Sequence, residues 1–253
     1  MIYTLDDLEH ISLNTDTMGS LYLDVGTAID APHSSAWILR DENCQVIGIE
    51  PNNECLEILK SGRPPADFHC IHLDESAIYL EGEKIKEFNN EQFMVINCAI
   101  DDVETPTTMD FYHTDARNLG CSSLLKPTDA LGLDVDKVSE ITVTSLEHVL
   151  DTLDLSDIEE IKFVKTDTQG KDFDVVRSLG KYLHKVVGLK CEYNVTNQYE
   201  NPNSRNEFVQ YMNQKNFDIV GDSGYDIYFF NTRFSHTYSE LEVELLFTTL
   251  PKL

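Results

Sequence analysis

The sequence lacks several features that would place a protein in a class at once. Its 253 residues contain no apolar stretch near the roughly 20 residues that a membrane-spanning helix needs. The first residues, MIYTLDDLEH, are acidic, unlike the basic and then apolar start of a secretory signal. No repeat, low-complexity tract or Pro/Gly/Ser-rich linker divides the chain. These absences predict a cytoplasmic protein with one domain, residues 1–253.

Basic residues are scarce. The chain has 19 Lys+Arg against 45 Asp+Glu, which gives a formal net charge of −26 at pH 7. A surface with this charge repels phosphate backbones, and no run of basic residues offers a local exception. We therefore expect no nucleic-acid partner for this acidic protein.

Paired cysteine motifs are also absent. The six cysteines include no CxxC pair, so the usual zinc and redox patterns are missing. Several cysteines stand inside apolar runs, such as MVINCAI (94–100) and VVGLKCEYN (186–194), where free cysteine serves as a small core residue. We expect the cysteines to be reduced and structural.

Short apolar runs alternate with helical patterns along the chain. Runs such as SLYLDV, CQVIGI and IEEIKFVKTD are apolar throughout, as in strands of a parallel sheet that is covered on both faces. Polar caps precede several of the helical patterns, such as Ser204 for one helix and either Thr144 or Ser145 for another. The expected helices are approximately His33–Arg40, Asn53–Ser61, Ser145–Leu153, Lys171–Leu179 and Ser204–Asn216.

The last two apolar runs, FDIV and YDIYFFN, are separated only by Gly-Asp-Ser-Gly (221–224), which predicts a hairpin. A parallel sheet that ends in an antiparallel hairpin is the layout of class I methyltransferases. We therefore predict an α/β, Rossmann-like fold with a mostly parallel seven-stranded sheet, helices on both faces and a C-terminal antiparallel hairpin. Residues 1–20 form an N-terminal helical extension in this prediction.

Two further β-hairpin insertions interrupt the alternation. One is expected over residues 74–90, with its turn at Glu81–Gly82. In the other, TTMDFYHT (107–114) pairs with SEITVTS (139–145). Both would lie at a sheet edge or over a site, where loops carry specificity.

The segment LYLDVGTAID (21–30) predicts a strand that turns at Gly26 into a helix. A dinucleotide fingerprint needs GxGxxG to seat a pyrophosphate, but no other glycine follows Gly26 until Gly48. The P-loop pattern GxxxxGK[ST] is missing as well. A cofactor without phosphate needs only one close approach of the backbone, so S-adenosylmethionine is the better candidate.

A second motif supports a nucleoside site. VIGIEPN ends in Glu50, which stands 24 positions after Gly26, close to the spacing of about 20 residues for a ribose-binding acid. A carboxylate at that place accepts hydrogen bonds from both ribose hydroxyls. Each motif alone has a structural interpretation, as a strand turn and as a helix start. Their order and separation favour a ligand.

Several motifs, in the same order, resemble the FkbM-type S-adenosylmethionine-dependent methyltransferases. LDVGTAID is similar to the family's DVGAN-x-G, VIGIEPN to its V-x-x-FEP, and GCSSL (120–124) to its Gly-x-Ser-Ser/Leu piece. The block KTDTQGKDF (165–173) resembles the Asp-Val-Glu-Gly region and is the most specific piece. The resemblance extends from about Leu21 to Asn231. The chain departs from the pattern at Asp30, where a glycine is usual, at Thr27–Ala28, and at Gln169, where a glutamate is usual.

The resemblance implies S-adenosylmethionine as the cofactor and a set of residues around it. Carried over by position, Asp24, Gly26 and Thr27 would surround the methionine end of the cofactor. Glu50 would bind the ribose. The adenine would be bordered by Ala99, Ile100 and Asp101.

Asp167 stands at the end of the predicted fourth strand, at the switch point where open α/β sheets bind ligands. Methyl transfer to a hydroxyl needs a general base or a metal. Asp167 and Glu192 are candidates to take the proton, or to hold Mg²⁺ or Mn²⁺ together with Asn194, and Lys165 shares the cleft. In the alternative interpretation, Asp167 only caps the helix that starts near Lys171.

His113, in the segment DFYHTDARN, is a further candidate for the base or for the acceptor pocket, although it is equally consistent with a plain loop histidine. His69 and His72 would point to opposite faces of a strand, which suits surface residues better than zinc ligands. One group of aromatic residues would stack on a sugar or cover the core: Tyr193, Tyr199, Tyr225 and Tyr228.

The sequence therefore predicts an O-methyltransferase that acts on a sugar hydroxyl of a glycan or a glycosylated metabolite. The sugar is implied by the family resemblance alone. Methylation of a nitrogen or a carboxyl group is an alternative, and so is a non-catalytic binding or scaffold protein. Gln169 and Asp30 favour the scaffold, whereas Glu50 and Asp167 favour the enzyme.

Overall fold

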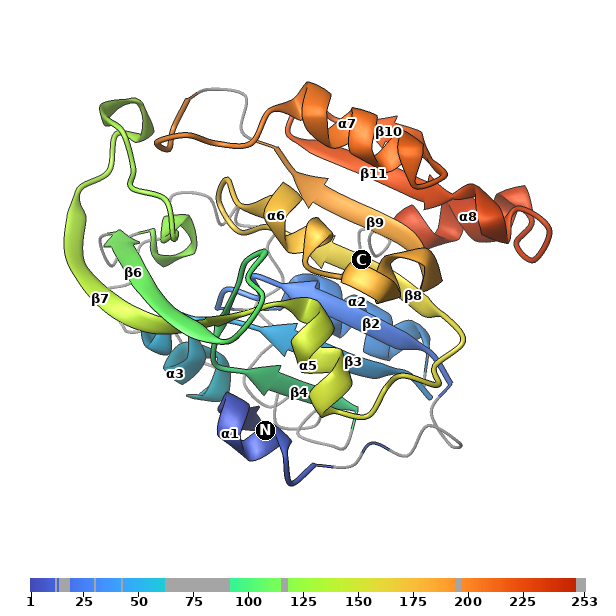
Figure 1. Ribbon diagram of the computed structural model, residues 1–253, viewed down its shortest axis with the longest axis horizontal. Helices are drawn as coiled ribbons and strands as arrows, with labels where there is room; N and C mark the ends of the chain where they lie inside the picture. The colour runs from blue at the N-terminus through green and yellow to red at the C-terminus, as the bar shows by residue number, and fades with distance from the viewer. Residues whose placement is uncertain are drawn as a thin grey trace.

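The computed structural model describes residues 1–11, 13, 19–29, 31–41, 43–61, 92–114, 118–193 and 197–248. Within these ranges the chain forms an eight-stranded sheet in the order β1-β4-β3-β2-β8-β9-β11-β10 and a three-stranded sheet in the order β5-β7-β6 (Figure 1). Some predicted features lie outside the described residues: Asp30, Asn194, His69, His72 and the hairpin at 74–90.

The centre of the large sheet is parallel and buried. All five residues of β2 and all five of β3 are buried, because both faces of these strands are covered by helices. Neighbouring strands pair in register, with Leu23 opposite Ile47 on one side and opposite Val164 on the other. The parallel core strands are β2 (Leu21–Val25), β3 (Gln45–Ile49), β4 (Phe93–Ile96), β8 (Ile161–Thr166) and β9 (Val186–Glu192).

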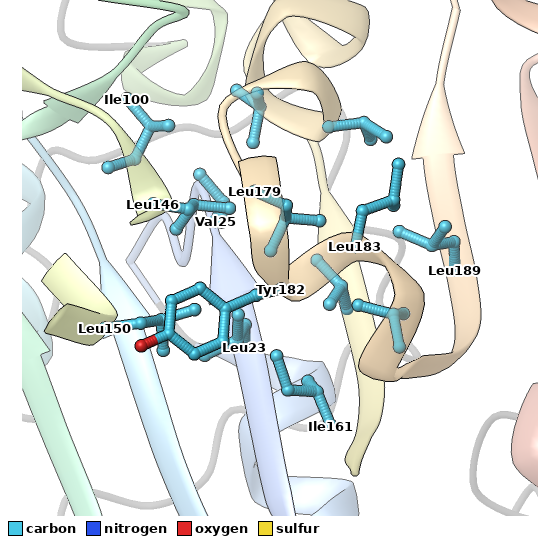
Figure 2. Close-up of a cluster of buried hydrophobic side chains, with 14 of the residues drawn as sticks. Leu23, Val25, Ile100, Leu146, Leu150, Ile161, Leu179, Tyr182, Leu183 and Leu189 are labelled. Carbon is cyan, nitrogen blue, oxygen red and sulfur yellow. The ribbon is translucent and has the colours of Figure 1, made fainter. Parts of the chain in front are cut away.

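Helices pack on both faces of this sheet, as predicted. One apolar core joins the strands to α5, α6 and α7, and a second joins the opposite face to α2, α3 and α8. In the first core, Leu23 and Ile161 of the strands meet Leu150 and Tyr182 (Figure 2). The helices are α2 (Pro32–Arg40), α3 (Asn53–Ser61), α5 (Leu146–Thr152), α6 (Asp172–Arg177), α7 (Arg205–Gln214) and α8 (Glu240–Phe247), with short 3₁₀ turns η1 (Leu119–Cys121), η2 (Asp129–Leu131), η3 (Gly180–Lys185) and η4 (Thr232–Phe234).

The predicted C-terminal hairpin is present. β10 (Phe217–Asp222) pairs antiparallel with β11 (Asp226–Asn231), and β11 pairs antiparallel with β9. The large sheet has one strand more than the seven predicted, because β1 (Ile2–Tyr3) adds parallel to β4. Residues 1–20, expected to be a helical extension, thus contribute this strand before α1 (Leu5–Leu8).

The second sheet contains the predicted pairing of TTMDFYHT with SEITVTS. β6 (Thr107–Thr114) runs antiparallel to β7 (Val135–Thr144), with Thr108 opposite Thr142, and β5 (Ala99–Ile100) runs parallel to β7. Figure 1 shows the β6–β7 hairpin beyond the carboxyl ends of the parallel strands, on the side where a ligand site is expected. None of the helices in the described ranges is long and apolar enough to cross a membrane.

Candidate active site

A cavity of about 160 Å³ lies where the carboxyl ends of β2, β3 and β8 meet the loop after β6. The strand ends supply its floor, and the segment 119–124 supplies part of its wall. Five of the residues that the sequence predicts for the site line this cavity: Gly26, Glu50, Ala99, Ile100 and Asp167. Other residues that line it are Val25, Ala28, Ile49, Pro51, Cys98, Phe111, Leu119, Gly120, Ser122, Leu124, Thr168, Gln169 and Lys171.

Gly26 shapes the turn after β2. Its φ of +79° falls in the left-handed region, and a Cβ built there would stand 2.0 Å from the backbone oxygen of Asp167. The amide of Asp167 in turn donates to Val25 O at 3.0 Å, which ties the ends of β2 and β8 together. Glycine is therefore required here by the approach of another strand of the same chain as well as by its conformation.

Glu50 ends β3 as a buried carboxyl group at the cavity. Its Oε2 accepts from Ala28 N–H at 2.9 Å and its Oε1 from Asn52 N–H at 2.8 Å. Burial raises the pKa of Glu50 to about 7, although these two backbone hydrogen bonds favour the ionised form. Each carboxylate oxygen keeps a second lone pair for a ligand hydroxyl.

Asp24 and Lys165 form a buried support below the turn and do not line the cavity. Asp24 Oδ2 accepts from the N–H of Ser34 at 3.2 Å and from its hydroxyl at 2.6 Å. Lys165 Nζ lies 3.3 Å from Asp24 Oδ1 and donates to Gly26 O at 2.5 Å. Burial would lower the pKa of Lys165, but the carboxylates of Asp24 and Asp167 outweigh it and raise that pKa above its usual value. These contacts place a permanent cation under the site.

Asp167 and Glu192 meet at the ends of β8 and β9 through the side chain of Gln169. The Nε2 of Gln169 lies 2.8 Å from Asp167 Oδ1 and 2.8 Å from Glu192 Oε2. Burial and the charge of Asp167 raise the pKa of Glu192. Partial desolvation opposes the ionisation of Asp167, yet Lys165 and the amide of Gln169 hold its pKa below the usual value. At neutral pH the pair therefore consists of an ionised Asp167 and a protonated Glu192.

The structure contradicts the alternative interpretation in which Asp167 caps α6. Lys171 occupies the N-cap position of α6, and no side chain caps that helix. The carboxylate of Asp167 points instead to Gln169 Nε2 and lies 3.9 Å from Lys165 Nζ, with 42% of its side chain exposed.

Thr27 and Asp101 lie near the cavity without lining it. Thr27 is buried, and its methyl group packs under Gly48. Asp101 forms an ion pair with Lys171, Oδ2 to Nζ at 2.9 Å, and Lys171 also reaches Asp174 at 2.6 Å. Lys171 lines the cavity, a position that the sequence interpretation missed because it treated this lysine only as a helix start.

His113 lies on β6, away from the cavity lining. Its Nε2 is 2.7 Å from Ser139 Oγ, and its ring meets Phe111 edge to face at 4.9 Å. Burial lowers its pKa, so the ring is neutral at pH 7. Phe111, on the same strand, lines the cavity, and the ring of His113 packs against it.

The four tyrosines have different surroundings. Tyr199 is buried, with its hydroxyl 2.8 Å from Gln169 Oε1 and 2.8 Å from Cys121 O. Tyr228 packs on Phe247, and Tyr193 donates to Asp222. Only Tyr225 among the four is strongly exposed, at 67%. Tyr199 thus contacts Gln169, which in turn binds Asp167 and Glu192, and its ring is not free to stack on a sugar.

The buried cysteines behave as core residues. Cys44, Cys98 and Cys191 are buried, and burial raises the pKa of the Cys44 and Cys98 thiols to about 12. In the part of the chain that the structure describes, no three His, Cys, Asp or Glu side chains gather as metal ligands. Asn194, the third predicted metal ligand, lies outside that part.

The cavity fits a nucleoside cofactor without phosphate. Apolar side chains such as Ile49, Ile100 and Phe111 offer a surface for a base, and Glu50 offers acceptors for ribose hydroxyls. Thr168 lines the cavity, and its buried Oγ1 has no hydrogen-bond partner among the described residues. The acids Glu50 and Asp167 would repel a phosphate but not a sulfonium cation. These residues would hold S-adenosylmethionine.

Comparison with known proteins gives a family match. The family model described as Methyltransferase FkbM domain matches residues 24–219, which is more than half of the chain. No curated protein matches. Among solved structures, the crystal structure of a SAM dependent methyltransferase from Aquifex aeolicus is similar, with 11% identity over 85% of this chain and 82% of that chain and a TM-score of 0.37. The family match spans Gly26, Glu50, Asp167 and Glu192, and the chain belongs to the FkbM methyltransferase family as an S-adenosylmethionine-dependent methyltransferase.

Proposed function

We propose that this methyltransferase acts on a hydroxyl group, and that the hydroxyl belongs to a sugar of a glycan or of a glycosylated metabolite. The observation that carries the proposal is the carboxylate of Asp167, which lines the cavity at the end of β8 and is held ionised by Lys165. The sugar is supported by the family's motifs, and the hydroxyl by the chemistry of the site.

Methyl transfer to a hydroxyl requires removal of one proton. Bound S-adenosylmethionine supplies an activated methyl group. The hydroxyl oxygen is a weak nucleophile until its proton leaves, and an ionised carboxylate within reach accepts that proton. Asp167 is the ionised member of the acid pair, with part of its side chain exposed. Glu192, kept protonated by burial and by Asp167, does not compete for the proton.

The same electrostatics disfavour one of the alternatives. A carboxylate acceptor would meet the negative charge of Asp167 in a cavity that also holds Glu50, and like charges at short range repel. Methylation of an amine would depend less on Asp167, because a neutral amine already has a nucleophilic lone pair. The net charge of −26 also argues against nucleic-acid acceptors.

The test is the Asp167→Asn variant, which keeps the shape of the side chain and removes its charge. We expect S-adenosylhomocysteine to bind the variant within a few-fold of wild type by calorimetry. Transfer of labelled methyl to a panel of glycosides should fall by at least 100-fold, within the roughly 10²–10⁴-fold contribution of general bases.

The matched control is Asp110→Asn on the exposed part of β6, which should leave both measurements unchanged. Near wild-type turnover in Asp167→Asn would remove Asp167 from the mechanism. Transfer to amines and not to any hydroxyl would refute the proposed acceptor while leaving the methyltransferase assignment intact.

A further inference from the structure

The side chain of Gln169 occupies the space between the two acids. Both of its N–H bonds are engaged, because Nε2 lies 2.8 Å from Asp167 Oδ1 and 2.8 Å from Glu192 Oε2. Gln169 holds this position with a φ of +57°, a left-handed backbone conformation that residues other than glycine seldom adopt. Backbone conformations of this kind persist where surrounding contacts fix them.

Those contacts are present around the backbone and the side chain of Gln169. The Tyr199 hydroxyl lies 2.8 Å from Gln169 Oε1, and the Ser123 hydroxyl donates to Gln169 O at 2.9 Å. Tyr199 is itself buried. Turning the amide over would place its oxygen against the ionised carboxylate of Asp167, which has no proton to donate. The donor side of the amide therefore faces the acids.

Two carboxyl groups that share a site cannot both be ionised unless a donor or a positive charge lies between them. Divalent cations do this in acidic sites, and they require oxygen ligands that face the ion. Here the face that a cation would need is occupied by N–H₂, which cannot act as a ligand. The described side chains thus fit a hydrogen-bonded pair better than the Mg²⁺ or Mn²⁺ site considered for Asp167 and Glu192 from the sequence.

We propose that Gln169 is a positioning residue whose amide takes the place of a divalent cation between Asp167 and Glu192, so that methyl transfer needs no cation. The proposal rests on the proposed function of Asp167 as the base. It makes the identity of residue 169 the switch between a cation-independent site and a cation-dependent one. A glutamate at this position would put three carboxyl groups together, which is a set that binds Mn²⁺ or Mg²⁺.

The first experiment measures Mn²⁺ binding by electron paramagnetic resonance without any acceptor. Gln169→Glu has the same shape as wild type and adds a carboxylate, whereas Gln169→Met has nearly the same shape and adds none. We expect Gln169→Glu to bind Mn²⁺ at least tenfold more tightly than wild type or Gln169→Met. Adding Asp167→Asn to Gln169→Glu should remove the gained binding.

The second experiment measures methyl transfer with EDTA and with added Mn²⁺. Wild type should be unaffected by EDTA. Gln169→Glu should lose at least tenfold in EDTA and recover with Mn²⁺, and Gln169→Met should lose a similar factor without recovery. A purely structural role for Gln169 would give no such rescue by the ion. Binding of S-adenosylhomocysteine, followed by thermal shift, reports that each variant is folded.

Three outcomes would overturn the proposal: Mn²⁺ binding by wild type that Asp167→Asn abolishes, loss of wild-type activity in EDTA, or no gain of Mn²⁺ binding in Gln169→Glu. If Gln169→Glu does not fold, the two wild-type measurements decide. Failure of the proposed function is seen separately, because an active Asp167→Asn variant or an absence of S-adenosylhomocysteine binding refutes it without altering the Mn²⁺ result.

Discussion

Glu50 is a buried acid whose charge changes near neutral pH, at a place where a cofactor ribose is expected. Burial raises its pKa to about 7 in the protein without ligand. Ribose hydroxyls are donors toward this group, and only the ionised carboxylate accepts with both oxygens. The protonated form uses one oxygen as a donor and must give up part of that contact.

Cofactor affinity should therefore rise with pH. Below this pKa most protein molecules carry a protonated Glu50 and bind the ligand weakly. The dissociation constant of S-adenosylhomocysteine should therefore fall by about tenfold between pH 6 and pH 8. Calorimetry at three pH values measures this change. Glu50→Gln should bind more weakly and show no such pH dependence, and an equally steep dependence in that variant would assign the effect to another group.

Gly26 sets the position of Asp167 through the backbone. Gly26→Ala combines a left-handed φ, which costs about 1–2 kcal/mol for a side chain, with a Cβ that would stand 2.0 Å from Asp167 O. We expect a loss of at least about 3 kcal/mol of unfolding free energy in urea, from the added steric strain. Gly132→Ala is the matched control: its φ is +71°, and nothing lies within 4 Å of its Cβ. An equal loss in both variants would show that the contact with Asp167 is unimportant.

At this scale the sequence predicts the residues that stand at strand ends. Gly26, Glu50 and Asp167 follow apolar runs, and the carboxyl ends of parallel strands meet at one edge of the sheet, so their position at the cavity is predictable. Tyr199 and Ser123 are different, because their contacts with Gln169 join loops separated by 30 and 46 residues in the chain. No local pattern marks such contacts.

Among the elements, α2 determines how the chain leaves the turn after β2. The helix begins at Pro32 after Ala31, which has a φ of +41° and, as an alanine, offers no side-chain cap. The buried carboxylate of Asp24, on β2, accepts hydrogen bonds at that end of the helix from both the N–H and the hydroxyl of Ser34. A negative charge near a helix N-terminus is also favourable to the helix dipole.

Ser34→Ala should therefore destabilise the protein by about 1–3 kcal/mol, because it removes a buried hydrogen bond to a charged group. The neighbouring variant Ser35→Ala is the control: the Ser35 hydroxyl donates to the local backbone oxygen of Ala31 at 3.0 Å, and its loss should cost under about 0.5 kcal/mol. Urea unfolding of the two variants gives the comparison. A cost in Ser34→Ala no larger than that in Ser35→Ala would mean that Asp24 does not anchor α2.

The elements themselves were largely predictable, for reasons that differ along the chain. α3 has the predicted bounds, and Ser145 accepts from His148 N–H as the cap of α5, because period and capping residues are local signals. β1 was not predictable. It has only two residues, and no alternation exists over such a length, so its pairing with β4 depends on tertiary contact alone.

The charge of the whole molecule acts on its stability. A net charge of −26 places many carboxylates on one surface, and mutual repulsion favours the expanded unfolded chain. Several ion pairs of the described residues are exposed, as between Lys126 and Glu200 at 3.2 Å, and such pairs contribute little. Repulsion, not pairing, should therefore dominate the response to salt.

The melting temperature should consequently rise when sodium chloride is raised from 0.02 to 0.5 M, since the screening length falls from about 20 Å to about 4 Å over this range. We expect a rise of several degrees, corresponding to about 1–2 kcal/mol for a chain of this size. Potassium chloride should give the same rise if screening is the cause, because screening depends on ionic strength and not on the identity of the cation. A flat or falling melting temperature would show that attractive pairs outweigh the repulsion, and a rise confined to one salt would indicate specific binding of that ion.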